Sequence, residues 1–136
     1  MPPRDYRIAG LLFWLASLPV PLLFVAAEPV PGWRAFPLAL KDALSIALRP
    51  ADPYVLACLA ATLANALFFA ALALGPRPRR RRSPHAFALA LASLTLAAGS
   101  LVALAFAGLQ GRPHAGAALW LAAPALLAWA ARPAAK

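Results

Sequence analysis

The chain has 136 residues, of which 63% are hydrophobic and only 12% are charged, and its mean hydropathy is +0.74. A soluble protein of this size keeps roughly a quarter of its residues charged, so the composition argues against a water-covered surface and indicates a chain that lies mostly in lipid. The formal net charge of +9 alone would be typical of a nucleic-acid-binding protein, and the distribution of that charge must decide between partners.

Four long apolar segments contain no Asp, Glu, Lys, Arg or His, and each is predicted to be a transmembrane helix: residues 8–26, 54–74, 86–109 and 115–131. At about 1.5 Å per residue they reach about 25 to 36 Å, against a hydrocarbon core about 30 Å thick. Helix is favoured over strand because strand-like alternation is absent and because a helix satisfies its own backbone in lipid. The predicted fold is an all-α membrane protein, a four-transmembrane-helix bundle that forms a single domain over residues 1–136.

The first apolar segment contains Pro19 and Pro21, which we expect to kink the helix. A second interpretation stays open, because a basic start, an apolar run and the small residues before Glu28 are similar to a signal peptide. The apolar run is longer than the usual about 7 to 15 residues of such a peptide, which favours the spanning helix. Cleavage of residues 1–27 would leave three spans in the same orientation.

The connection between the first two spans contains residues 35–48, a segment too short to cross a bilayer. Lys41, Asp42, Ser45 and Arg49 fall on one face of a helix over this segment, and apolar residues cover much of the rest. This pattern predicts a short interfacial amphipathic helix in the headgroup region. The alternative is a surface loop packed on the bundle.

The polar residues inside the spans predict contacts between helices. Cys58, Thr62 and Asn65 are spaced i, i+4 and i+7, so they share one face of the second helix. An amide in hydrocarbon needs a hydrogen-bond partner, for which Ser93 and Ser100 of the third span are the candidates. The alternative is a polar lining for a solute or a quinone headgroup.

The basic residues are concentrated on one side of the predicted bundle. The connection over residues 75–85 contains five of the 13 Lys and Arg residues, namely Arg77, Arg79, Arg80, Arg81 and Arg82. With four spans, this connection and both termini share a side that holds nine basic residues, and the other side holds four. Lys and Arg are enriched in cytoplasmic loops, so a cell membrane (inner membrane) protein with both termini and the 75–85 loop in the cytoplasm is predicted.

Three kinds of partner could bind the arginine cluster. Anionic lipid headgroups are favoured, because basic residues near the surface gain about 1 kcal/mol each there. A docking patch for an acidic protein is the second interpretation. Nucleic acid is disfavoured, since no aromatic residues are interleaved with the arginines. The expected partners are therefore the lipid bilayer, including anionic headgroups, and a membrane protein partner or a second copy of the chain.

No catalytic, cofactor-binding or metal-binding residues are predicted, and no cofactor is expected. The spans contain no Asp, Glu, Lys, Arg or His that would mark a proton or ion path, and the sequence offers no nucleophile–base pair, carboxylate pair or phosphate-binding glycine loop. These features favour a small multi-pass membrane protein that is not an enzyme, a non-catalytic accessory, assembly or stabilising subunit of a larger membrane complex. The alternative is a small oligomeric transporter or channel with a polar path near Asn65.

Overall fold

The computed structural model describes residues 3–25, 28–75, 84–106 and 114–132 of the chain. The described part is mostly helical, and its elements follow in this order: α1 (Pro3–Ser17), β1 (Pro21–Val25), β2 (Glu28–Pro31), α2 (Gly32–Ala43), the 3-10 helix η1 (Leu44–Ala47), α3 (Pro53–Leu74), α4 (Pro84–Phe106) and α5 (Ala115–Ala131). A two-stranded antiparallel sheet of β1 and β2 departs from the all-α fold that the sequence predicts.

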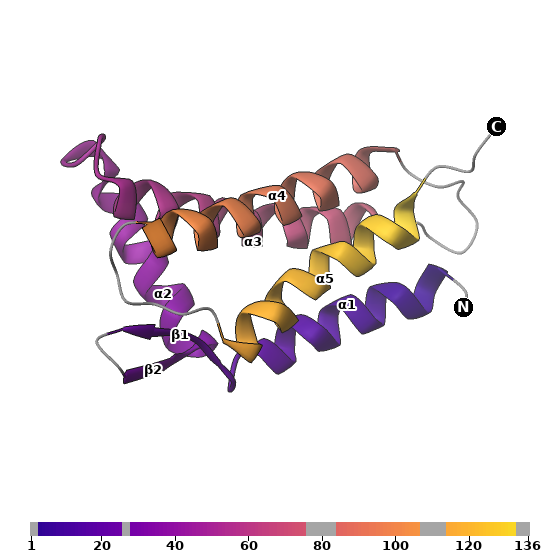
Figure 1. Cartoon of the computed structure of the whole chain (residues 1–136). Helices are drawn as coiled ribbons and strands as arrows, with labels where there is room; N and C mark the ends of the chain where they lie inside the picture. Colours follow the sequence, from indigo (N-terminus) through magenta and orange to yellow (C-terminus); the bar gives the residue numbers. More distant parts are fainter. Residues whose placement is uncertain (1–2, 26–27, 76–83, 107–113, 133–136) are drawn as a thin grey trace.

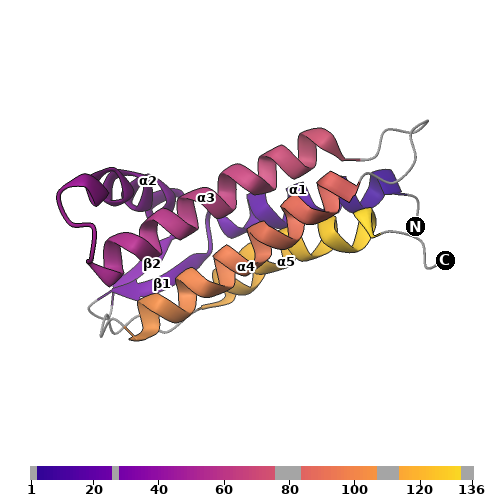
Figure 2. The same ribbon diagram turned by 90° about the horizontal axis from the view of Figure 1, so that it is seen from above.

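The long helices form a bundle with a distinct end. α3 and α4 pack side by side as a hairpin, α5 packs against α4, and α1 packs against α5. The first turn of α1 and the last turn of α5 lie at one end of the bundle, and β1, β2 and α2 lie at the opposite end (Figures 1 and 2). This second end, where the β1–β2 hairpin and α2 meet the bundle, is called the hairpin end below, after the two strands and not after the pair α3 and α4.

Two of the described helices, Pro53–Leu74 and Pro84–Ala105, are long and apolar enough to cross a membrane by length and composition. Only 39% and 33% of the most apolar stretch of each helix is buried inside the molecule. Most of this apolar stretch therefore has no contact with the rest of the chain that would bury it. Two further apolar helices, Tyr6–Ser17 and Ala115–Ala131, are shorter. α3 starts one residue before the expected 54, α5 has the expected bounds, and the expected residues 107–109 lie outside the described part.

Local chemistry sets the two ends of α3. Asp52 is the N-cap, and its carboxylate accepts a hydrogen bond of 2.9 Å from the backbone N–H of Tyr54. Pro53 occupies the first helical position, where a missing N–H removes no helical hydrogen bond. At the other end the Arg7 guanidinium donates to the carbonyl oxygen of Leu72. A cation is favourable at this carbonyl end of a helix, so Arg7 attaches the start of α1 to the end of α3.

The structure corrects the helix expected over residues 8–26. α1 ends at Ser17, and the chain then turns into strand β1 instead of continuing as a kinked helix. Pro19 and Pro21 have no backbone N–H to donate to the preceding turn, and their rings clash with it. Residues 18–25 of the apolar segment therefore form a turn and strand β1, and residue 26 lies outside the described part.

Hydrogen bonds from distant residues satisfy the backbone that this break exposes. Trp33 N–H donates to the carbonyl of Leu18 at 3.0 Å, and Gly32 N–H donates to that of Val20 at 3.4 Å. The carbonyl of Leu22 accepts from the backbone of His114 at 3.2 Å. These bonds meet the requirement that buried backbone groups be paired, and they join the strands to the starts of α2 and α5.

The segment expected as an amphipathic helix over residues 35–48 forms α2 followed by η1. Ala43 is buried, whereas Trp33 and Leu40 are 59% and 50% exposed. α2 packs against α3, and the Tyr54 hydroxyl donates to the Asp42 carboxylate at 2.7 Å. This ordered segment thus packs on the bundle as a helix.

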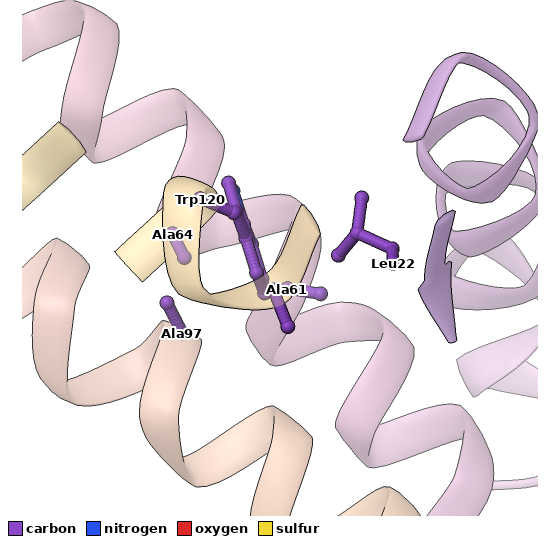
Figure 3. Close-up of a cluster of buried hydrophobic side chains, with 6 residues drawn as sticks. Leu22, Ala61, Ala64, Ala97 and Trp120 are labelled. Atoms are coloured by element: carbon purple, nitrogen blue, oxygen red, sulfur yellow. The ribbon is translucent and has the colours of Figure 1, made fainter. Parts of the chain in front are cut away.

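Two hydrophobic clusters fill the interior of the bundle. One surrounds Trp120, whose ring lies among small residues of α3 and α4 and Leu22 of β1 (Figure 3). The other contains Phe68 and Leu127 among alanines. Alanine dominates both clusters, so the helices approach closely and a few aromatic rings fill the remaining space.

The close approach of backbones at the hairpin end gives a first prediction. A Cβ atom added at Gly32 would lie 2.5 Å from the Ser17 carbonyl oxygen, and one at Gly116 would lie 2.6 Å from that of Pro21. We expect Gly32→Ala and Gly116→Ala each to lower the free energy of unfolding by roughly 1–3 kcal/mol. Unfolding by heat or denaturant in detergent, followed by circular dichroism, measures this change.

Gly99 provides the matched control, because a Cβ atom there meets nothing within 4 Å. Gly99→Ala should be neutral or stabilise α4 by up to about 1 kcal/mol, the difference in helix propensity. Equal effects of the three substitutions would contradict the packing described at the hairpin end.

Candidate functional site

The most connected polar side chain in the described interior is Asn65 of α3. Its Oδ1 atom accepts two hydrogen bonds, from the indole Nε1–H of Trp14 in α1 at 2.9 Å and from that of Trp120 in α5 at 3.0 Å. Its Nδ2 group donates to the carbonyl of Ala61 at 3.0 Å. Both lone pairs of the amide oxygen are therefore occupied, and one side chain joins three helices. This group is called the Asn65 centre below.

Aromatic rings enclose the Asn65 centre. The Trp14 ring stacks on Phe36 of α2 with centroids 5.6 Å apart and planes at 7°, and it meets Phe69 edge-on at 4.9 Å. Phe36 also contacts Trp120, with centroids 5.8 Å apart. Such pairs add about 0.5–1.5 kcal/mol beyond the area they bury. The ring of Phe36 thus joins α2 to both tryptophans that bond Asn65.

The structure changes the partners expected for Asn65. Ser93 donates to the carbonyl of Ala64 at 2.7 Å and so links α4 to α3, while Ser100 donates to Ala97 in its own helix at 2.8 Å. The indoles bond Asn65 in place of these serines. Trp14 and Trp120 both lie within the apolar segments of the sequence, and their N–H groups were the missed signal, because an indole N–H that is removed from water needs an acceptor.

The other residues of the predicted polar face have local roles. Thr62 donates to the carbonyl of Cys58 at 2.9 Å, one turn back in α3. Cys58 is a buried free cysteine. The arginine cluster over Arg77, Arg79, Arg80, Arg81 and Arg82 lies outside the described residues.

A pocket of about 470 Å³ opens beside the Asn65 centre at the hairpin end. α2, α3, α4, α5 and both strands contribute to its lining. Its buried residues include Leu22, Cys58, Ser100 and Trp120, and its exposed residues include Glu28 and Arg34. The deep part is therefore mostly apolar, and the mouth carries one negative and one positive side chain. Trp120 belongs both to this pocket and to the Asn65 centre.

The volume falls within the range of about 300–1,000 Å³ that is typical of small-molecule pockets. The polar groups at its buried wall already have partners, since the Trp120 indole bonds Asn65 and the Ser100 hydroxyl bonds Ala97. What remains for a ligand in the deep part is apolar surface. Among the described residues, no three His, Cys, Asp or Glu side chains are grouped as a metal site.

Comparisons of the chain with known protein families, with curated proteins and with solved structures find no match.

The Asn65 centre gives a second prediction. Asn65→Leu leaves the indole N–H groups of the partly buried Trp14 and of the buried Trp120 without an acceptor, and an unsatisfied buried donor costs about 1–3 kcal/mol. The free energy of unfolding in detergent should fall by about 2 kcal/mol or more. In a proton–nitrogen NMR spectrum, the indole N–H signals of Trp14 and Trp120 should shift, whereas those of the exposed Trp33 and Trp129 should not.

Thr95→Val is the control, because Thr95 is exposed and bonds only Leu91 in its own helix. Its effect on the free energy of unfolding should stay within about 0.5 kcal/mol. An Asn65→Leu protein with unchanged indole signals and unchanged stability would show that the Asn65 centre does not hold the bundle together.

Proposed function

We propose that this chain is a small integral membrane protein with four membrane segments, the long helices α3 and α4 and the shorter helices α1 and α5, and that it acts as a non-catalytic accessory, assembly or stabilising subunit of a membrane complex. The observation that carries the proposal is the inside-out polarity of α3 and α4. Asn65 and Ser93 are turned toward other helices, whereas large apolar side chains face outward: Leu56, Leu63, Phe69, Leu74, Leu91 and Val102. Lipid, and not water, suits such a surface.

The hydrogen bonds of the bundle support a lipid environment. Thr62 and Thr95 each return a hydrogen bond to the helix carbonyl four residues earlier, so neither presents an unpaired hydroxyl to lipid. In β1 and the turn before it, the carbonyls of Leu18, Val20 and Leu22 have backbone partners. The irregular segment at the hairpin end can therefore lie at the membrane interface without exposing these groups.

Aromatic and basic residues are paired at both ends of the bundle. The Arg34 guanidinium lies 5.7 Å from the Trp33 ring centroid at the hairpin end, and that of Arg132 lies 5.6 Å from Trp129 at the opposite end. Tryptophan and arginine are typical of the headgroup level on each side of a membrane. These pairs suit the two headgroup levels, and the charge asymmetry of the sequence supports a cytoplasmic location for both termini and the 75–85 loop.

The bonding of Asn65 supports a subunit over the alternative transporter or channel. A polar path needs side chains that exchange their hydrogen bonds with a solute. The acceptor oxygen of Asn65 instead holds two indoles, and Ser93 holds the backbone of α3. These groups stabilise the bundle, and the outward apolar faces of α3 and α4 remain for lipid or for a neighbouring membrane protein.

The third prediction tests the orientation with single cysteines. In a Cys58→Ala background, Ala51→Cys places an exposed thiol at the hairpin end, and Ser83→Cys places a thiol next to Arg82 in the sequence of the 75–85 loop. A membrane-impermeant maleimide applied to intact cells should label the Ala51→Cys protein, and it should label the Ser83→Cys protein only after lysis. Labelling of Ser83→Cys in intact cells to the same extent would contradict the proposed orientation.

The fourth prediction tests the subunit role. A photo-crosslinking amino acid at Leu63 or Val102, which are 46% and 55% exposed, should give a protein adduct of one constant mass in living cells. The same group at Leu48, which is 85% exposed and outside the proposed spans, is the matched control and should not give that adduct. Adducts with lipid alone would contradict the subunit role, and adducts with a second copy would favour the oligomeric alternative.

A further inference from the structure

The pocket at the hairpin end has two chemically different parts, and each part restricts the ligand. The deep part is formed by buried side chains such as Leu22, Ala61 and Trp120. Its indole and serine donors are already engaged in internal hydrogen bonds. A polar group placed there would lose its hydrogen bonds to water without replacement. The deep part therefore fits a hydrocarbon chain.

The mouth of the pocket carries opposite charges on two different elements. Glu28 begins β2 and Arg34 lies in the first turn of α2, and both side chains are exposed. Within the described part of the chain, neither forms an ion pair; Arg34 contacts the face of Trp33. A ligand head that carries one anion and one cation can therefore neutralise both charges, whereas a purely anionic head would meet the Glu28 carboxylate.

We infer that this pocket binds one acyl chain of a membrane phospholipid and places its phosphoethanolamine headgroup between Arg34 and Glu28. The guanidinium donates to the phosphate oxygens, and the primary ammonium of the headgroup donates to the Glu28 carboxylate. Both are charge-assisted hydrogen bonds. A choline headgroup has no N–H to donate to Glu28, and a glycerol headgroup has no cation, so ethanolamine suits the mouth better than either.

This inference rests on the proposed membrane location, which supplies the lipid at the interface. The residues that line the pocket come from α2, both strands and the long helices α3, α4 and α5, and Figure 2 shows that α2 and the strands lie at one end of the bundle. An acyl chain can enter it from the membrane while its headgroup stays at the level of Glu28 and Arg34. The lipid would then fill the space between α2 and the long helices and hold them together.

Cys58 provides the probe for the test, because it lines the pocket and is the only cysteine of the chain. The full-length protein in a maltoside detergent is titrated with lysophosphatidylethanolamine, lysophosphatidylcholine or lysophosphatidylglycerol, and the rate of Cys58 modification by a small thiol reagent is measured. Lysophosphatidylethanolamine should slow the modification. The concentration for half-protection should be about tenfold higher for the other two amphiphiles, since each lacks one charge-assisted bond.

Substitutions at the mouth provide the matched comparison. Glu28→Gln and Arg34→Gln should each raise the half-protection concentration of lysophosphatidylethanolamine about tenfold. Arg49→Gln, which removes an exposed arginine that does not line the pocket, should leave it unchanged. Ala39→Phe adds a ring to a half-buried position in the lining and should abolish the protection. Circular dichroism confirms that each variant is folded.

Equal protection by all three amphiphiles, or no protection by any of them, would overturn the inference.

A second measurement is mass spectrometry of protein that has been reconstituted in vesicles of phosphatidylethanolamine and phosphatidylglycerol and then re-extracted in detergent. It should find one retained phosphatidylethanolamine per chain in the unmodified protein and none in the Ala39→Phe protein. Alkaline carbonate extraction of cell membranes tests the proposed function separately, because release of the chain would refute membrane integration whatever the lipid titration gives.

Discussion

The arrangement of the described helices depends on one amide oxygen that accepts two indole N–H groups. Asn65 bonds Trp14 and Trp120, which fixes α1 and α5 relative to α3. Because Trp14 stacks on Phe36, the same contact also determines where α2 lies. An unpaired indole or amide in a medium of low dielectric constant is costly, so rotation of any of these helices breaks a bond that water cannot replace. Trp120 also lines the pocket, so its hydrogen bond to Asn65 fixes the position of that part of the pocket wall.

The apolar segments predicted most of the helical fold, because α3, α4 and α5 begin or end where charged residues, proline or glycine interrupt the apolar run. The same reasoning failed for residues 18–25, which are apolar but not helical. Hydropathy alone does not distinguish a kinked helix from a strand that turns back. The outcome depended on Gly32, Trp33 and His114, whose backbone N–H groups pair with the exposed carbonyls. Such partners, distant in sequence, leave no local pattern.

The candidate site was predictable only in part for a similar reason. The position of Asn65 inside an apolar span indicates that it needs a partner, and the polar hydroxyls of Ser93 and Ser100 favour these serines over Trp14 and Trp120 in a hydropathy pattern. A tryptophan counts as apolar in a hydropathy pattern although it carries one obligatory donor. Counting indole donors against the available acceptors would have favoured the observed centre. The pocket had no such signal, since six elements spread along the chain between Leu22 and Trp120 form it together.

The alanine-rich interior explains why a few polar hydrogen bonds determine how the helices are rotated relative to one another. In the proposed membrane setting, lipid tails are as apolar as the helix surfaces, so the hydrophobic effect does not drive helices together. Small residues instead permit close contact, as at Gly10, where an added Cβ would lie 3.2 Å from the Ala123 carbonyl oxygen. Alanine faces resemble one another, and many rotations of a helix would pack nearly as well. The Asn65 bonds and the contacts of Phe36 remove that ambiguity, because only one arrangement brings both indoles to the same oxygen atom.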